Sequence, residues 1–302
     1  MANGTVETVV EDRYPSRVDG RIRRIARQEP VVWGDVHDGP LTKADLAQFE
    51  AEGFVVLEDL LGATEVEDLL LEVERLSHLE ELDDDERLVS EPDTGAVRSV
   101  FEVHELSPVF GALCEDTRLR DPARQILGSQ VAIHQSRVNR KPGFDGREFS
   151  WHSDFETWHV EDGMPAMRAL TASVALTSNR MDNGSLLIIP GSHRTFVGCA
   201  GETPSDHYRE SLRAQRYGVP DRGALSDLAA AGGVRTVALR PGSVVLFDCN
   251  CMHGSNSNIT PFGRCNLFVV YNSIQNPLGS PFGGTPPRPR FLAARDDDTR
   301  LR

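Results

Sequence analysis

Two residues with the spacing of metal ligands lie in the segment FSWHSDFETWHVEDGMPAMRA, which covers positions 149–169. His152 and Asp154 are two positions apart, so both side chains point the same way if the backbone is extended. An imidazole and a carboxylate together suit a divalent metal such as Fe(II). Because an H-x-D pair alone occurs by chance in many proteins, a third ligand is needed from elsewhere in the chain.

His253 is our candidate for that third ligand, because the apolar segment GSVVLFD leads toward it, and Arg264 opens the next predicted strand. Two histidines and one carboxylate on one side of an iron leave the opposite coordination positions open. A guanidinium on the neighbouring strand can then hold a carboxylate through two parallel hydrogen bonds. Taken singly, each residue is better explained as structural. The four together, on a β-rich chain, favour a metal centre with an anion-binding arginine.

Three other groups are weaker candidates for metal ligands. His159 shares no strand face with the H-x-D pair. Asp248 lies closer to His253 in sequence, but strand alternation turns it to the opposite face. Cys249 and Cys251 offer soft thiolates, yet one C-x-C pair without a second pair is poor evidence for zinc.

The segment QVAIHQSRVNRK has a period of two, which predicts a strand that positions polar groups. One face of this strand would carry Val131, Ile133, Gln135, Arg137, Asn139 and Lys141. That face begins apolar and becomes polar, as in a strand that runs from a core into a pocket. A solvent-facing edge strand has the same polarity, and the pattern by itself leaves both interpretations open.

Two helices are predicted ahead of this strand. Thr42 and Asp45 have capping-box spacing and Gly53 is a stop signal, so we expect a helix between them and a short strand at FVVL. Thr64 and Glu67 repeat the capping spacing before a second helix. The apolar face of that helix comprises Val66, Leu69, Leu70, Val73 and Leu76.

Further strands are predicted at RALTASVALT, VRTVAL, GSVVLFD and RCNLFVVYN, and the Asn183-Gly184 pair predicts a tight hairpin. Many short strands, Gly- and Pro-rich turns and helices mainly at the front predict a mainly β fold with flanking helices, a sandwich or jelly roll. We expect residues 1–40 to form a solvated, partly helical N-terminal arm. Residues 41–290 would form a single jelly-roll domain with an insertion near 196–233, and residues 291–302 a polar C-terminal tail.

The composition excludes several classes of partner. A formal net charge of −14 argues against nucleic acid and anionic membranes, which both favour basic surfaces. No stretch approaches the roughly 18 apolar residues of a membrane span, and the first residues lack the charged-then-apolar order of a secretory signal. The five dispersed cysteines are typical of a reducing compartment, so we expect a cytoplasmic protein.

Three features together resemble the phytanoyl-CoA-hydroxylase-like non-haem iron dioxygenases: the H-x-D pair, the segment DNGSLLIIPGSH, and the distal histidine followed by Arg264. The segment over 149–169 is similar, essentially without interruption, to the signature of ectoine hydroxylases. The resemblance implies a double-stranded β-helix (jelly roll) core that uses Fe(II), 2-oxoglutarate and O2. It further implies hydroxylation of ectoine to 5-hydroxyectoine, with succinate and CO2 as co-products, and a homodimer.

The resemblance also implies roles for individual residues. His152, Asp154 and His253 would bind iron. Arg264 would hold the distal carboxylate of 2-oxoglutarate. The residues that would assist at this co-substrate are Arg137, Asn139, Lys141, Thr171 and Ser255. The residues that match the ectoine site are Gln135, Thr157, Trp158, Ala169, Phe247 and Phe268.

Two other functions compete with ectoine hydroxylation. A related dioxygenase would act on another small amino-acid-like substrate, although Gln135, Trp158, Phe247 and Phe268 argue against it. A metal-binding jelly-roll sensor without oxygenase activity has no need to chelate 2-oxoglutarate, so Arg264 and the polar strand face argue against a sensor.

Overall fold

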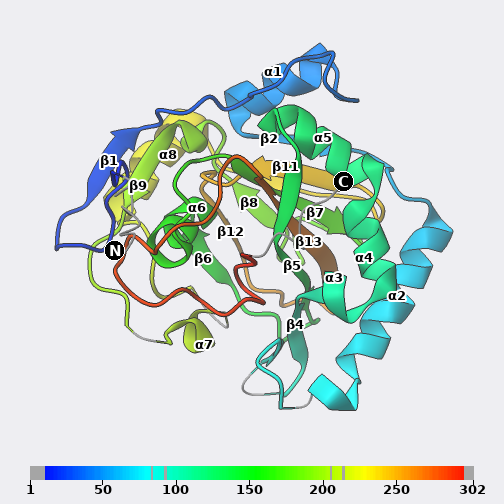
Figure 1. Ribbon diagram of the computed structural model, residues 1–302. Helices are drawn as coiled ribbons and strands as arrows, with labels where there is room; N and C mark the ends of the chain where they lie inside the picture. The colour runs from blue at the N-terminus through cyan, green and yellow to red at the C-terminus, as the bar shows by residue number, and fades with distance from the viewer. Residues whose placement is uncertain (1–10, 83, 92–93, 205, 213–214, 296–302) are drawn as a thin grey trace, which may run out of the picture.

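The computed structural model describes residues 11–82, 84–91, 94–204, 206–212 and 215–295 (Figure 1). The helices are α1 (Lys43–Glu52), α2 (Ala63–Ser77), η1 (Glu80–Leu82), α3 (Val103–Leu106), α4 (Pro108–Glu115), α5 (Thr117–Leu127), α6 (Asp154–Thr157), η2 (Trp158–Asp162), η3 (Ser192–Arg194), α7 (Tyr208–Ser211) and α8 (Arg222–Gly232). The strands are β1 (Arg23–Ala26), β2 (Phe54–Leu57), β3 (Leu88–Ser90), β4 (Val97–Phe101), β5 (Val131–Lys141), β6 (Phe149–His152), β7 (Ala169–Ala175), β8 (Leu186–Ile188), β9 (Thr195–Gly198), β10 (Arg235–Val237), β11 (Val244–Asp248), β12 (His253–Ser255) and β13 (Arg264–Ser273).

Two antiparallel sheets face each other and enclose the site. The large sheet has the strand order β2-β11-β7-β13-β5-β4-β3, and the small sheet has the order β10-β8-β12-β6. A separate ribbon pairs β1 with β9. This arrangement is the double-stranded β-helix, or jelly roll, with flanking helices that the sequence predicted.

The large sheet has an apolar core on each face, because its strands alternate. Val244 and Leu246 of β11 pack toward helices α1, α2, α4 and α5, which cover the outer face (Figure 1). Val245 and Phe247 of the same strand pack inward against the small sheet, where they contact Ile188 and its neighbours. The helices thus seal one face of the sheet, and the other face is left to form the site.

The beginnings of the first two helices test the capping predictions. Thr42 and Asp45 form the predicted capping box of α1, and Gly53 ends that helix in the left-handed conformation. The prediction for α2 is wrong at its start: the N-cap is Gly62, whose backbone N–H donates to Glu65 at 2.8 Å. Of the predicted apolar face only Leu70 is half-buried, and the other members are buried.

Strand β5 is central, so the edge-strand interpretation is wrong: β5 lies between β13 and β4. The prediction of one continuous face is also wrong. The register against β13 shifts between Ile133 and Gln135, so that His134 is the extra residue of a β-bulge. Val131 and Ile133 therefore join the helix-side core. The bulge turns Gln135 and the following alternate residues to the inner face.

The connections and ends also depart from expectation. The Asn183-Gly184 turn joins β7 to β8, which belong to different sheets, so it is not a hairpin. Residues 11–40 contain strand β1 and no helix, and Arg17 in this arm is buried. In the expected polar tail, Leu292 is buried, while residues 296–302 lie outside the described ranges. None of the helices in the described ranges has the length and apolar character needed to cross a membrane.

Candidate metal centre and its two cavities

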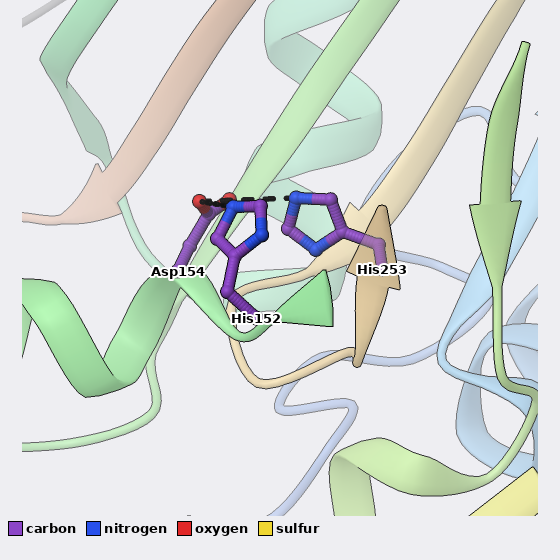
Figure 2. Close-up of side chains that lie close together, drawn as sticks. All are labelled: His152, Asp154 and His253. Carbon is purple, nitrogen blue, oxygen red and sulfur yellow. Dashed lines mark ion pairs between the residues drawn. The ribbon is translucent and has the colours of Figure 1, made fainter. Parts of the chain in front are cut away.

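The three predicted ligands meet at one point, held by the small sheet. His152 ends β6, His253 begins β12, and the two are direct cross-strand partners. Asp154 begins α6, two residues after the end of β6. Its Oδ1 lies 3.6 Å from Nε2 of His152 and 3.9 Å from Nε2 of His253. Within the described ranges this trio is the group of His, Cys, Asp and Glu side chains with metal-binding geometry, its donor atoms all within 4.8 Å of one another (Figure 2).

The protein fixes which atom each ligand presents. Nδ1 of His152 contacts the Ser150 carbonyl at 2.8 Å, and Nδ1 of His253 contacts the Cys251 carbonyl at 3.0 Å. These contacts place the ring proton on Nδ1 and leave both Nε2 atoms free as donors to a metal. Burial, and then the neighbouring His152, lower the pKa of His253 to about 4, which favours the neutral imidazole that ligates metals.

The carboxylate ligand is oriented in the same way. Thr171 Oγ1 donates to Asp154 Oδ2 at 3.2 Å, so Oδ1 is the oxygen turned toward the histidines. Burial raises the pKa of Asp154, but its interactions with the neighbouring His253, His152 and Arg137 side chains outweigh burial and hold the pKa below its usual range. Two neutral imidazoles and one ionised carboxylate on one side fit Fe(II) with open positions opposite.

One cavity next to the ligands is lined by cations. Arg264, Lys141, Asn139 and Ser255 line it together with both histidine ligands. Arg264 donates to Asn139 Oδ1 at 2.9 Å, and Lys141 Nζ donates to Ser255 Oγ at 2.8 Å. The predicted co-substrate residues Arg264, Asn139, Lys141 and Ser255 therefore lie together.

Two cations of this cavity, Arg264 and Lys141, form no ion pair with a carboxylate among the described residues. Arg264 and Lys141 are direct cross-strand partners, an arrangement that like charges make unfavourable. Burial, followed by the charges of Arg264 and Arg98, lowers the pKa of Lys141 to about 6. Burial also lowers the pKa of Arg264 to about 10. Among the described residues, the buried Nε atoms of Arg264 and Arg137 have no hydrogen-bond acceptor. Such a cavity fits a dianionic ligand.

A second cavity also borders the ligands. Gln135, Thr157 and Trp158 line it with Asp154. Arg137 and His152 line both cavities, so the metal centre and one guanidinium stand at their junction. Trp158 is only 4% exposed, and its ring packs edge-on against His134 at 5.0 Å between centroids. The second cavity therefore combines an aromatic wall, an amide and a cation beside the metal ligands.

Four further predicted residues lie around these cavities without joining the groups described above. Thr171 hydrogen-bonds the ligand Asp154 and lines neither cavity. Phe247 and Ala169, both within the described ranges, also line neither; the Phe247 ring packs against His253 at 4.9 Å. Phe268 lines the cationic cavity, where the Arg137 guanidinium lies 5.0 Å from its ring.

The weaker ligand candidates have structural roles. His159 contacts the Met164 carbonyl and Asp12, and stacks on Phe282. Asp248 forms an ion pair with Arg27 at 2.7 Å. Cys249 and Cys251 are buried free thiols, and burial raises the pKa of each.

Sequence patterns missed three arginines near the site, of which Arg98 and Arg17 are buried and Arg288 is half-buried. Arg98 lines the cationic cavity and pairs with Glu91 at 2.7 Å. Arg288 lines the second cavity while its guanidinium binds both oxygens of Asp162. Arg17 binds Glu156 and Glu161. For Arg17 and Arg288 the available signal was the acidic run of the 149–169 segment, whose three buried carboxylates require cations.

Comparison with known proteins agrees with this geometry. The phytanoyl-CoA dioxygenase (PhyH) family model matches residues 49–265, a range that includes all three ligands and Arg264. The chain belongs to the phytanoyl-CoA dioxygenase family. This family member is 54% identical to the ectoine dioxygenase of Bordetella bronchiseptica, over 94% of this chain and 93% of the relative.

Solved structures are also similar to this phytanoyl-CoA dioxygenase family member. EctD from S. alaskensis with 2-oxoglutarate and 5-hydroxyectoine is 47% identical, with a TM-score of 0.88, covering 97% of this chain and 98% of that chain. EctD from S. alaskensis with bound Fe is also 47% identical, with a TM-score of 0.87 and the same coverage.

Proposed function

We propose that this protein hydroxylates ectoine to 5-hydroxyectoine, using Fe(II), 2-oxoglutarate and O2 and releasing succinate and CO2. The observation that carries the proposal is the junction of two cavities at the His152, Asp154 and His253 trio. One cavity fits a dianion, and the other fits a small polar ring. The relatives named ectoine dioxygenase, and the EctD structure with 2-oxoglutarate and 5-hydroxyectoine, support this substrate and co-substrate.

Each side of the junction has a distinct task. Bound iron would supply the activation of O2 that accompanies the decarboxylation of 2-oxoglutarate. Arg264 binds the distal carboxylate of 2-oxoglutarate, assisted by Lys141, Asn139 and Ser255, which lie beside it. Arg137 lies at the junction and adds positive charge toward both 2-oxoglutarate and ectoine. Thr171 acts by orienting Asp154.

The second cavity selects the substrate. Ectoine is a small ring with an amidinium and a carboxylate. Trp158 offers an aromatic face to the amidinium, an interaction worth about 0.5–2 kcal/mol depending on desolvation. Gln135 and Thr157 offer hydrogen bonds from the cavity wall. Ala169 and Phe247 complete the proposed ectoine site from behind the cavity wall, and Phe268 does so from the adjoining cationic cavity. The Phe247 ring packs against His253, and the Phe268 ring packs against the Arg137 guanidinium. Each phenylalanine therefore acts on the site through the residue that it contacts.

A substrate panel tests the function. The protein is reconstituted with Fe(II) under argon, given 2-oxoglutarate, and mixed with oxygenated buffer that contains ectoine or another small amino-acid-like molecule such as proline. We expect succinate and a product heavier by one oxygen with ectoine, and little product with the others. Efficient hydroxylation of another compound would favour the related dioxygenase. Iron binding without any succinate would favour the sensor.

We also propose a cytoplasmic homodimer that makes a compatible solute under osmotic stress. All five cysteines are buried and free, which supports a reducing compartment. Four exposed apolar side chains, at Phe144, Met181, Ile259 and Phe262, belong to neighbouring loops and support an interface. Light scattering on the purified protein tests the dimer, and Phe262→Ser, which removes one of the exposed apolar groups, should weaken it.

A further inference from the structure

The acidic residues of the 149–169 segment form a buried row beside the second cavity. Glu156 and Glu161 are 1% and 2% exposed, and they flank the two residues of the proposed ectoine wall, Thr157 and Trp158. Glu161 and Thr157 themselves line the cavity. Buried carboxylates are costly unless they are paired and hydrogen-bonded. The residues that pair with Glu156 and Glu161 therefore help to fix the position of the wall formed by Thr157 and Trp158.

Arg17 is the cation that joins this row. Its Nε and one terminal nitrogen donate to the two oxygens of Glu156 at 2.9 and 2.5 Å. The other terminal nitrogen donates to Glu161 at 2.6 Å, and a further contact reaches Thr157 Oγ1 at 3.3 Å. One planar guanidinium thus binds residues on both sides of Trp158, which a point charge cannot do with the same geometry.

The backbone of Arg17 adds a second observation. Its φ is 56°, in the left-handed region that residues other than glycine seldom adopt. Its N–H donates to the Cys199 carbonyl at 2.9 Å, and Ser16 Oγ donates to Glu156 at 2.5 Å. A strained conformation persists where the surroundings determine it. Here the hydrogen bonds from the Arg17 side chain to Glu156 and Glu161 hold the Arg17 backbone in this conformation.

Arg17 lies outside the part of the chain that the phytanoyl-CoA dioxygenase family model matches. The phytanoyl-CoA dioxygenase match begins at residue 49, whereas Glu156 and Thr157 lie within it. The N-terminal segment is attached by the ribbon of β1 and β9, which appears at the left of Figure 1. Through Arg17 this segment forms a clamp beside the proposed substrate wall.

We propose that Arg17 is a positioning residue for the substrate: through Glu156, Glu161 and Thr157 it holds the wall of Thr157 and Trp158 in place for ectoine. The inference rests on the proposed function, because that function assigns the wall to ectoine. The alternative is that Arg17 merely anchors the N-terminal segment. The two roles predict different effects of substitution. Loss of an anchor lowers the stability of the fold, whereas loss of a positioning residue weakens the binding of ectoine.

Arg27 provides a matched control. It lies in the same segment, its side chain is 3% exposed, and it is paired with Asp248 at 2.7 Å. It also donates to the Met167 carbonyl at 2.6 Å. Neither partner lines the second cavity. Arg27→Ala thus removes an anchor of similar burial without touching the wall.

The experiment compares Arg17→Ala, Arg17→Lys and Arg27→Ala with the parent in the iron-loaded enzyme. It measures the melting temperature, the half-saturating concentrations of ectoine and 2-oxoglutarate, and ectoine binding by calorimetry without oxygen. We expect Arg17→Ala to weaken ectoine binding by about tenfold or more, because small misplacements at a site are costly. The 2-oxoglutarate requirement should stay within about twofold, and Arg17→Lys should recover part of the loss. Arg27→Ala should lower only the melting temperature.

Two results would overturn the proposal: equal ectoine affinity in Arg17→Ala and the parent, or an equal loss of affinity in Arg27→Ala. If Arg17→Ala does not fold, Glu156→Gln replaces it, since Glu156 contacts Arg17 and does not line the cavity. Glu156→Gln should then weaken ectoine binding, and parental affinity in this variant would overturn the proposal. A parent that binds no ectoine would instead contradict the proposed function, so the two failures are distinguishable.

Discussion

His152 and His253 face each other as direct cross-strand partners in the small sheet, with ring centroids 4.2 Å apart. The ladder between β6 and β12 therefore sets their separation, although the two residues are far apart in the chain. The Nδ1 atom of each is held by the backbone carbonyl two residues earlier in the chain, that of Ser150 in β6 and that of Cys251 just before β12. A metal site built on a sheet in this way is rigid, and its neighbours offer no spare ligand within the described residues.

We predict that His152→Ala, Asp154→Ala and His253→Ala each abolish stoichiometric iron binding and activity. Each substitution leaves two ligands, which do not hold a labile divalent ion against buffer. Elemental analysis of the reconstituted protein measures the effect. His159→Ala is the control: it should lower the melting temperature, because His159 is buried, and retain iron. Full iron occupancy in any of the first three variants would remove that residue from the ligand set.

Arg264→Lys should raise the half-saturating concentration of 2-oxoglutarate and leave iron in place. Lysine keeps the charge but loses the planar pair of donors, and hydrogen bonds to charged groups contribute about 1.5–3 kcal/mol. That corresponds to roughly 10- to 100-fold in affinity. Titration of 2-oxoglutarate at saturating ectoine measures it. An unchanged requirement would count against Arg264 as the clamp.

The binding of 2-oxoglutarate should weaken as pH rises above about 6. Lys141 has its pKa lowered to about 6, first by burial and then by Arg264 and Arg98. A bound dianion favours the charged amine, so its pKa in the complex is higher and binding takes up a proton. Between the two pKa values the half-saturating concentration should rise by up to about tenfold per pH unit.

Two variants of Lys141 isolate this effect. Lys141→Arg carries a charge that does not titrate in this range, so it should bind 2-oxoglutarate with little pH dependence. Lys141→Met should bind weakly at every pH. The same slope in parent and Lys141→Arg would assign the pH dependence to another group.

Trp158→Ala should abolish ectoine hydroxylation while iron and 2-oxoglutarate still bind. The substitution removes the aromatic face and leaves a carbon that is no longer held in place for reaction. Succinate formation without hydroxylated product should persist slowly. Loss of a buried Trp also costs about 3–5 kcal/mol of stability, so melting curves must accompany the assay. Trp158→Phe should recover part of the activity. Parental activity in Trp158→Ala would make Trp158 a packing residue.

The ligand set could be predicted because its signals are local. The two-residue spacing of His152 and Asp154, and an apolar strand before His253, follow from the geometry of extended chain. The resemblance of the 149–169 segment then supplied the chemistry. Gln135, Arg137, Asn139 and Lys141 lie on the inner face of β5 as expected. The prediction failed only at the start of the strand, at Val131 and Ile133. There the bulge at His134 shifts the alternation, and no residue type in that strand announces a bulge.

Contacts between distant segments could not be predicted. Arg17 and Glu156 are 139 positions apart, and Arg288 and Asp162 are 126 positions apart. Their pairing depends on how the ends of the chain pack over the jelly roll, which local patterns do not encode. The acidic row was visible in the sequence, but its partners were not. Phe247 and Ala169 were matched from the resemblance alone, and their places behind the site reflect packing.

The most direct test of the account is a single-turnover reaction with isotopically labelled oxygen gas, followed by mass spectrometry of both products. The enzyme is loaded with Fe(II), 2-oxoglutarate and ectoine without oxygen and then exposed to ¹⁸O2. We predict equal amounts of succinate and 5-hydroxyectoine, with one labelled atom in each. Succinate without labelled 5-hydroxyectoine in the parent enzyme would contradict the claim that this site hydroxylates ectoine.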